Sequence, residues 1–271
     1  MSSKETGSAE QAVDERSLAS SFNQEANFYD KFRMGYPDQL FSTIDERLEL
    51  TELSNILEIG CGAGQATVPL AARGYNLTAV EPGDALARVT AEKITKNPKA
   101  RVIVSSFENA QLPSENYDLV LAAMSLHWVN EDVRFSKPAD LLKTGGRLAI
   151  LYNWPLFTKT DAPFYDSLNT LARTHQMEGS LVPIREDELT IHPWIEDKYF
   201  DTPEFFTLKT RHAFDSGLAY AGFLATLSAV SVTPEPNRSN FLTDVAALIR
   251  ADYGDSLALS YISTLALARK K

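Results

Sequence analysis

The feature that most constrains this chain is a short apolar run, residues 56–59, that passes directly into a turn with glycine at positions 60, 62 and 64. A helical pattern follows over residues 65–73. Glycine lets the backbone approach a ligand where a Cβ would collide, and the start of a helix presents unpaired N–H groups. The stretch therefore predicts a buried strand that turns sharply into a helix beside a bound ligand.

The spacing of acids and glycines indicates the kind of ligand. The next apolar run ends at Glu81, where a carboxylate can accept hydrogen bonds from both hydroxyls of a ribose, so a nucleoside is expected. A dinucleotide fingerprint requires a third glycine three residues after the second. Counted from Gly62, that position holds Gln65. The motif is instead acid-x-Gly-x-Gly-x-Gly from Glu58, which disfavours a dinucleotide-dependent oxidoreductase.

Composition limits the partners and the compartment. With 271 residues, 44% of them hydrophobic, the chain can bury a sizeable core. Its net charge of −10 would repel nucleic acid. A single cysteine excludes an internal disulfide framework and fits a reducing compartment. No apolar run reaches the roughly 18 residues of a membrane span, and residues 1–20 lack a signal-peptide centre. We expect a cytoplasmic monomer or simple homodimer that binds neither nucleic acid nor a membrane.

Strand and helix patterns alternate along the first part of the chain. Strands are predicted at residues 55–59, 76–80, 101–105, 117–124 and 147–152, and helices at 65–73, 84–96 and 130–143. Such alternation implies a doubly wound, mostly parallel sheet. The later pattern predicts strands at residues 205–214 and 257–268 around helices at 217–227 and 239–252.

This order resembles the class I S-adenosylmethionine (SAM) dependent methyltransferases, whose first motif has the same glycine spacing. The resemblance runs from about residue 22 to the end and is closest to the branch of the trans-aconitate methyltransferases and related small-molecule enzymes. Further matching motifs lie at residues 29–37, 106–108, 126–129 and 141–146. Met34 departs from the proline usual in the first of them, which we expect to loosen that turn. The resemblance implies an α/β, Rossmann-like sheet of seven strands with an antiparallel last strand.

The resemblance also implies a division of the chain. We expect a disordered lead over residues 1–21, an N-terminal helical lid over 22–50 and a SAM-binding Rossmann-like core over 51–153. A cap insertion is expected over residues 154–203, and the remainder of the sheet with acceptor-pocket helices over 204–271.

Ten residues match positions that bind SAM in the family. Gly60, Cys61 and Gly62 would line the methionine moiety with backbone groups, and Glu81 would bind the ribose. The complete set is Tyr29, Arg33, Gly60, Cys61, Gly62, Glu81, Pro82, Ser106, Phe107 and Ala123. For three of them a structural role stays open: Phe107 and Tyr29 as core residues, and Arg33 as a surface residue.

The acceptor pocket is expected at the carboxyl edge of the sheet, where open α/β sheets bind ligands. Its predicted residues are Tyr36, His127, Trp128, Trp154, Thr226 and Ser228. His127 is the candidate catalytic residue, as a general base, but a cap on the following helix is an equal alternative. A carboxylate acceptor would need no base. The other three histidines show no metal-ligand spacing, so no metal is expected.

The sequence as a whole therefore predicts a SAM-dependent methyltransferase that acts on a small molecule, with a carboxylate or hydroxyl oxygen favoured as acceptor. Two alternatives remain: a non-catalytic SAM-binding protein and, less favoured, a dinucleotide-dependent oxidoreductase. A nucleic-acid methyltransferase is disfavoured by the acidic charge and by the absence of an Asn-Pro-Pro-aromatic motif.

Overall fold

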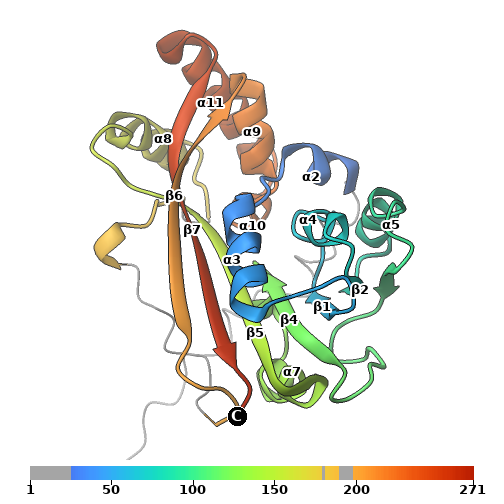
Figure 1. The fold of residues 1–271 in the computed structure, drawn as a ribbon. Helices are drawn as coiled ribbons and strands as arrows, with labels where there is room; N and C mark the ends of the chain where they lie inside the picture. Colours follow the sequence, from blue (N-terminus) through green and yellow to red (C-terminus); the bar gives the residue numbers. More distant parts are fainter. Residues whose placement is uncertain (1–25, 179–180, 189–197) are drawn as a thin grey trace, which may run out of the picture.

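A seven-stranded sheet forms the centre of the protein (Figure 1). The computed structural model describes residues 26–178, 181–188 and 198–271. Its strand order is β3-β2-β1-β4-β5-β7-β6, in which β7 runs antiparallel to both of its neighbours and the other pairs are parallel. The strands are β1 Asn55–Ile59, β2 Asn76–Glu81, β3 Ala100–Val104, β4 Tyr117–Ala123, β5 Leu142–Pro155, β6 Glu204–Phe214 and β7 Leu257–Arg269. The predicted fold class is confirmed, including the antiparallel last strand.

The central strands are buried on both faces, as expected for apolar runs in a parallel sheet. Alternate residues of β1 contribute to two different clusters: Leu57 and Ile59 pack on one face and Ile56 on the other. Helices α3 (Asp38–Leu48) and α4 (Thr67–Ala72) cover the face of Ile56, and α7 (Ser136–Leu141) covers the opposite face.

The register brings three strand ends to one edge. Ile59 pairs with Val80 of β2 and with Ala122 of β4. The strand order reverses between β1 and β4, and such a reversal is where doubly wound sheets bind ligands. The glycine turn after β1, Glu81 at the end of β2 and the turn after β4 therefore lie beside one another.

The predicted helix over residues 130–143 is wrong in its extent. The structure has two short helices there, α6 (Glu131–Arg134) and α7, followed at once by β5. Pro138 explains the break, because proline is tolerated in the first turn of a helix and not in its interior. Strand β5 extends beyond both predicted ends, because Leu142 pairs with Tyr117 of β4 and the pairing with β7 continues to Pro155.

The part of the chain after β5 packs into a third apolar cluster. Helices α8 (Ala162–Thr174), α9 (Gly217–Ala225) and α11 (Asn237–Tyr253) surround the upper part of β7 (Figure 1). Along the chain, the one-turn helix η2 (Glu186–Glu188) follows α8, and the one-turn helix α10 (Ser228–Ser231) lies between α9 and α11. The predicted lead, and parts of the predicted lid and cap, lie outside the described residues. Within those residues, no helix has the length and apolarity needed to cross a membrane.

Helix α2 (Ala26–Phe32) lies between α9 and α5 (Asp84–Lys93), as Figure 1 shows. Gly222 of α9 permits this packing, because a Cβ there would come within 2.6 Å of the Phe32 ring. Helix α2 therefore connects the cofactor side of the sheet with the C-terminal helices.

Candidate functional site

Gly60 begins the turn after β1, and only glycine fits there. Its φ is +68°, and a Cβ built on it would lie 2.7 Å from the Cβ of Ser125. The Ser125 hydroxyl donates a hydrogen bond to the carbonyl of Ile59. Gly60 and Cys61 both donate their backbone N–H to the Val80 carbonyl, at 2.8 and 3.1 Å. These bonds join the carboxyl ends of β1, β2 and β4 around the glycine turn.

Glu81 faces the same turn from the end of β2. Its Oε2 accepts a hydrogen bond from the N–H of Gly62 and its Oε1 one from the N–H of Gly83, each at 2.9 Å. Burial raises the pKa of this carboxyl, and the two N–H groups oppose that effect. Each carboxylate oxygen has about two lone pairs, so each can accept one more bond, as the two hydroxyls of a ribose require.

Gly62 differs from Gly60 because the fold does not crowd it. Its φ is +54°, and a Cβ there would meet only the Gln65 amide oxygen at 3.7 Å and Cε1 of Tyr29 at 3.9 Å. The Thr90 hydroxyl donates a 2.7 Å bond to the Gly62 carbonyl. The turn at Gly62 therefore has no side chain over it, its carbonyl is fixed by Thr90, and it lies opposite Tyr29 of α2. This arrangement suits a ligand that is bound by main-chain groups.

Glu58, the acid that opens the motif, is buried at the end of β1. Burial is the main reason that its pKa is raised to about 8; Thr67 opposes this rise, and the nearby Glu81 adds to it. Burial is also the main reason that the pKa of the Cys61 thiol is raised, followed by the charges of Glu58 and Glu81. With a pKa of about 8, Glu58 is mostly protonated at pH 7, and the Cys61 thiol is unreactive. Glu81 is therefore the acid of the glycine turn that can carry a negative charge toward a ligand.

Helix α2 is bound to the glycine turn through Lys93. The Lys93 ammonium pairs with Asp30 and donates a 2.9 Å hydrogen bond to the Ala63 carbonyl. Arg33 directly follows α2, its N–H donates a 2.9 Å bond to the Tyr29 carbonyl, and its guanidinium carbon lies 5.7 Å from the Tyr29 ring centre. Both residues thus lie on the segment that faces the turn.

Arg33 carries its charge toward the predicted acceptor pocket. Burial is the largest influence on three pKa values: it raises those of Tyr36 and Tyr261 and lowers that of His127. The positive charge of the Arg33 guanidinium lowers all three. Tyr36 and His127 were predicted pocket residues, and Tyr261 of β7 was not. A residue of the predicted cofactor set therefore stands close to the acceptor set.

The loop after β3 is held by a lysine that the sequence pattern did not reveal. The Lys137 ammonium donates to the carbonyls of Phe107, Glu108 and Ala110 at 2.6, 3.0 and 2.9 Å. The Phe107 ring is 4% exposed and packs in the core, as the structural alternative predicted. The Ser106 Oγ accepts a long 3.4 Å bond from the N–H of Asn109. Adenine contacts by Ser106 and Phe107 stay predictions.

An aromatic row lies at the ends of β4 and β5. The ring of Tyr152 stacks on Trp154 with a centroid distance of 5.3 Å, and on His127 at 6.3 Å. Trp128 stands 5.0 Å from His127 on the other side. Three predicted residues, His127, Trp128 and Trp154, are therefore brought together. Tyr152 also belongs to the row, although it was not predicted from the sequence. It could have been predicted, because residues two apart in a strand, such as Tyr152 and Trp154, lie on the same face.

The surroundings of His127 bear on both of its predicted roles, general base and helix cap. Asn130 caps α6, since its side chain accepts the N–H of Asp132 at 2.9 Å, so the cap alternative for His127 is wrong. The His127 residue keeps an exposed edge, yet burial lowers its pKa to about 4, helped by the charges of Arg134 and Arg33. The imidazole is therefore neutral at pH 7, and cations rather than a carboxylate face it.

The remaining predicted residues are less closely involved. Pro82 is exposed beside Glu81, and Ala123 is the half-buried last residue of β4. Thr226 is buried, and its hydroxyl donates a 2.6 Å bond to the Phe223 carbonyl inside α9. Ser228 opens α10, and among the described residues neither Thr226 nor Ser228 forms a hydrogen bond to the aromatic row. Their pocket roles stay predictions.

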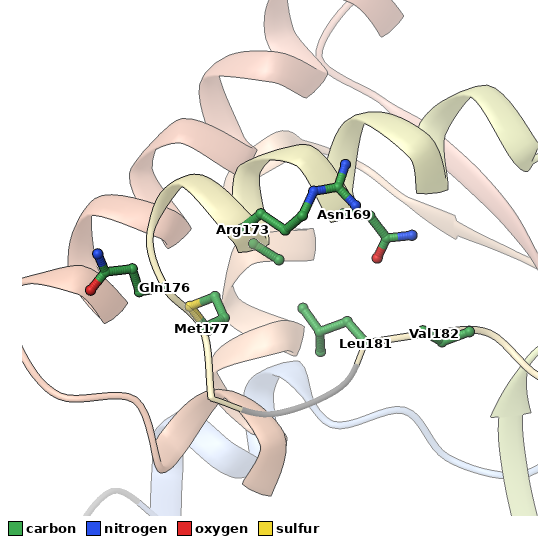
Figure 2. Close-up of a pocket in the computed structure, with 7 residues that line it drawn as sticks. Asn169, Arg173, Gln176, Met177, Leu181 and Val182 are labelled. Carbon is green, nitrogen blue, oxygen red and sulfur yellow. The ribbon is translucent and has the colours of Figure 1, made fainter.

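A surface hollow of about 340 Å³ lies elsewhere, between α8 and the segment that follows it (Figure 2). Arg173 and Met177 face Leu181 across it. It contains none of the predicted site residues, so the candidate site remains the carboxyl edge of the sheet.

The central part of the chain is similar to known methyltransferases. Residues 57–150 match the family model described as a methyltransferase domain. A Dictyostelium discoideum protein named as a methyltransferase is 36% identical over 130 residues, which cover 48% of this chain and 47% of that protein. A Saccharomyces cerevisiae protein named as a SAM-dependent methyltransferase is 28% identical over 135 residues, covering 48% and 46%. The range that matches the methyltransferase-domain model contains the glycine turn, Glu81 and the aromatic residues after β4.

The fold extends the likeness to most of the chain. A solved structure from Anaeromyxobacter dehalogenans, described as a type II methyltransferase, superposes with a TM-score of 0.63 at 24% identity, over 88% of this chain and 97% of that one. This likeness shows the α/β, Rossmann-like methyltransferase fold. The chain spans about half the length of the curated relatives that it matches.

Proposed function

We propose that the protein is a SAM-dependent methyltransferase that acts on a carboxylate or hydroxyl oxygen of a small molecule. The single observation that carries the proposal is Glu81, whose carboxylate is held by two backbone N–H groups beside the bare Gly62 turn. The domain match over residues 57–150 and the named relatives support it. Membership of the trans-aconitate branch stays a prediction.

The residues present fit this cofactor. Glu81 would bind the ribose hydroxyls, and the backbone of Gly60–Gly62 would hold the methionine moiety. When bound, SAM supplies a methyl group activated by a sulfonium. The task of the chain is then to align an acceptor with that methyl group and to exclude water.

An oxygen acceptor fits the charges near the aromatic row. Arg33 and Arg134 both lower the pKa of His127, so an anionic acceptor would be attracted to the row. A base with a pKa of about 4 is weak at neutral pH, which favours an acceptor that is already ionised. A carboxylate meets both conditions.

The test is methyl transfer itself. The protein is incubated with SAM and a panel of carboxylic acids, phenols and amines, and release of S-adenosylhomocysteine (SAH) is measured. We expect turnover with a carboxylic acid and a rate that is flat between pH 6 and 8, because His127 stays neutral throughout. His127→Ala should raise the acceptor KM while kcat changes by less than about threefold.

Turnover confined to amines would contradict the oxygen-acceptor proposal. A loss of kcat of about 10²-fold or more in His127→Ala, together with loss of a pH-dependent limb, would make His127 a general base and exclude a carboxylate in favour of a hydroxyl acceptor. SAH binding without turnover on any acceptor would favour the alternative of a non-catalytic SAM-binding protein.

A further inference from the structure

Two buried tyrosine hydroxyls near the candidate site have no hydrogen-bond partner among the described residues. They belong to Tyr165 of α8 and Tyr261 of β7, which are 3% and 1% exposed. Buried polar groups in native proteins are almost always hydrogen-bonded, and an unsatisfied one calls for an explanation such as a ligand. Two such hydroxyls in one cluster are therefore a specific feature of this region.

The two tyrosines come from different parts of the chain and meet in the third apolar cluster. Each raises the pKa of Tyr220 on α9, and Tyr165 raises that of Tyr261, in every case after the larger effect of burial. The hydroxyls are thus close to one another, between the predicted cap insertion, the helix that contacts α2, and the sheet.

Charges connect this cluster with the candidate acceptor site. The Arg33 guanidinium lowers the pKa of Tyr261 and also that of His127. Asp161 is the acid that faces both tyrosines, but its own oxygens already accept bonds from Ser260, Thr158 and Arg211. The charge of Arg33 therefore acts both on His127 of the aromatic row and on Tyr261.

We propose that Tyr165 and Tyr261 form the distal end of the acceptor site and select acceptors that carry a second oxygen-containing group away from the methylated atom. This inference rests on the proposed function for the methylated end. A tyrosine hydroxyl can donate to an oxygen and accept from a hydroxyl. A hydroxyl or carboxyl at the far end of the acceptor would satisfy both residues, with Arg33 adding a positive charge.

The first test needs no acceptor. Removing an unpartnered buried hydroxyl removes its desolvation cost, so Tyr165→Phe and Tyr261→Phe should each raise the melting temperature, by roughly 1–4 °C. Tyr75→Phe is the matched control, because the buried Tyr75 hydroxyl donates a 2.5 Å bond to Asp45. It should melt lower than wild type. A decrease in both test variants like that of the control would show that an internal water already satisfies the hydroxyls, and would overturn the proposal.

The second test uses SAH-bound protein and matched acids of four to eight carbons: a simple carboxylic acid, its ω-hydroxy acid and its dicarboxylic acid, for example hexanoate, 6-hydroxyhexanoate and adipate. We expect the ω-oxygen to improve affinity about tenfold at the best chain length. The gain should vanish in Tyr165→Phe and Tyr261→Phe and persist in Tyr75→Phe.

Three results would overturn the inference. They are equal affinity of the wild-type protein for the three acids, no binding of any of them, and a gain in affinity from the ω-oxygen that persists in both Tyr165→Phe and Tyr261→Phe. Calorimetry with SAH alone separates this failure from failure of the proposed function. If SAH binds and the acids behave alike, the distal site is wrong while the cofactor site stands.

Discussion

The cofactor side and the acceptor side of the site satisfy their polar groups in different ways. On the cofactor side, Glu81 accepts two backbone N–H groups, and Thr90 and Lys93 donate to carbonyls of the glycine turn. On the acceptor side, the Tyr165 and Tyr261 hydroxyls have no partner among the described residues, and aromatic rings supply most of the contacts. One region is preorganised by its own backbone, and the other depends on side chains from distant elements.

This contrast predicts that the cofactor side is the more sensitive to single changes. Gly62→Val should abolish SAH binding, because a branched side chain would occupy the space over the turn and lose the φ of +54°. Gly254→Val is the control, since Gly254 has a similar φ of +67° and nothing within 4 Å of its added Cβ. In both variants a non-glycine residue must adopt a left-handed backbone conformation, which costs about 1–2 kcal/mol. The difference in SAH affinity between the two variants therefore measures the effect of the added side chain on the binding site. SAH binding that persists in Gly62→Val would remove the turn from the site.

Glu81→Ala should have the next largest effect. It should weaken SAH binding by about 1–3 kcal/mol, since the ribose hydroxyls would lose a charged acceptor. Glu81→Gln, which keeps one acceptor oxygen, should fall between wild type and Glu81→Ala. Because Glu81 also bonds Gly62 and Gly83, melting temperatures must accompany the calorimetry. Unchanged affinity in a folded Glu81→Ala protein is the result that excludes a ribose contact.

A smaller effect is expected at Lys137, which the sequence did not predict. Lys137→Met removes three bonds to the carbonyls of the loop after β3 and should weaken SAH binding about threefold to tenfold, roughly the loss of one net hydrogen bond. Lys143→Met is the control, since Lys143 pairs with Asp118 at the opposite edge of the sheet. If both variants lose stability alike and neither changes SAH affinity, Lys137 has only a structural role.

The last prediction concerns the pH dependence of stability, not SAH affinity, and its residue is Glu58. Burial raises the pKa of Glu58 from 4.5 to about 8, so between these values the folded protein binds more protons than the unfolded chain. The contribution of Glu58 to the free energy of unfolding should therefore fall as pH rises from about 4.5 to 8. Glu58→Gln should remove that decline, and substitution of the exposed Glu52 should not. Denaturant titrations at several pH values measure both slopes; parallel curves for wild type and Glu58→Gln would contradict the raised pKa.

The same contrast explains how much the sequence could predict. The strands and the glycine turn depend on local patterns, and the structure confirms their order and the antiparallel β7. Lys137, Tyr165 and Tyr261 gain their surroundings only from long-range packing, so a helical or strand pattern contains no signal for them. The grouping of His127, Trp128 and Trp154 could be predicted because each lies near the end of a strand at the edge where open α/β sheets bind ligands, and their roles in the site stay predictions. The break at Pro138 was missed because the apolar period continues across it.

The central claim is tested most directly by calorimetric titration of the wild-type protein with SAM, SAH, NAD and NADP, with Gly62→Val and Gly254→Val as paired variants. We expect SAM and SAH to bind at a single site in the wild-type protein and in Gly254→Val. We expect Gly62→Val to bind neither of them, and NAD and NADP not to bind the wild-type protein. Binding of NAD or NADP in place of SAM, or SAM binding that is indifferent to Gly62→Val, would contradict it.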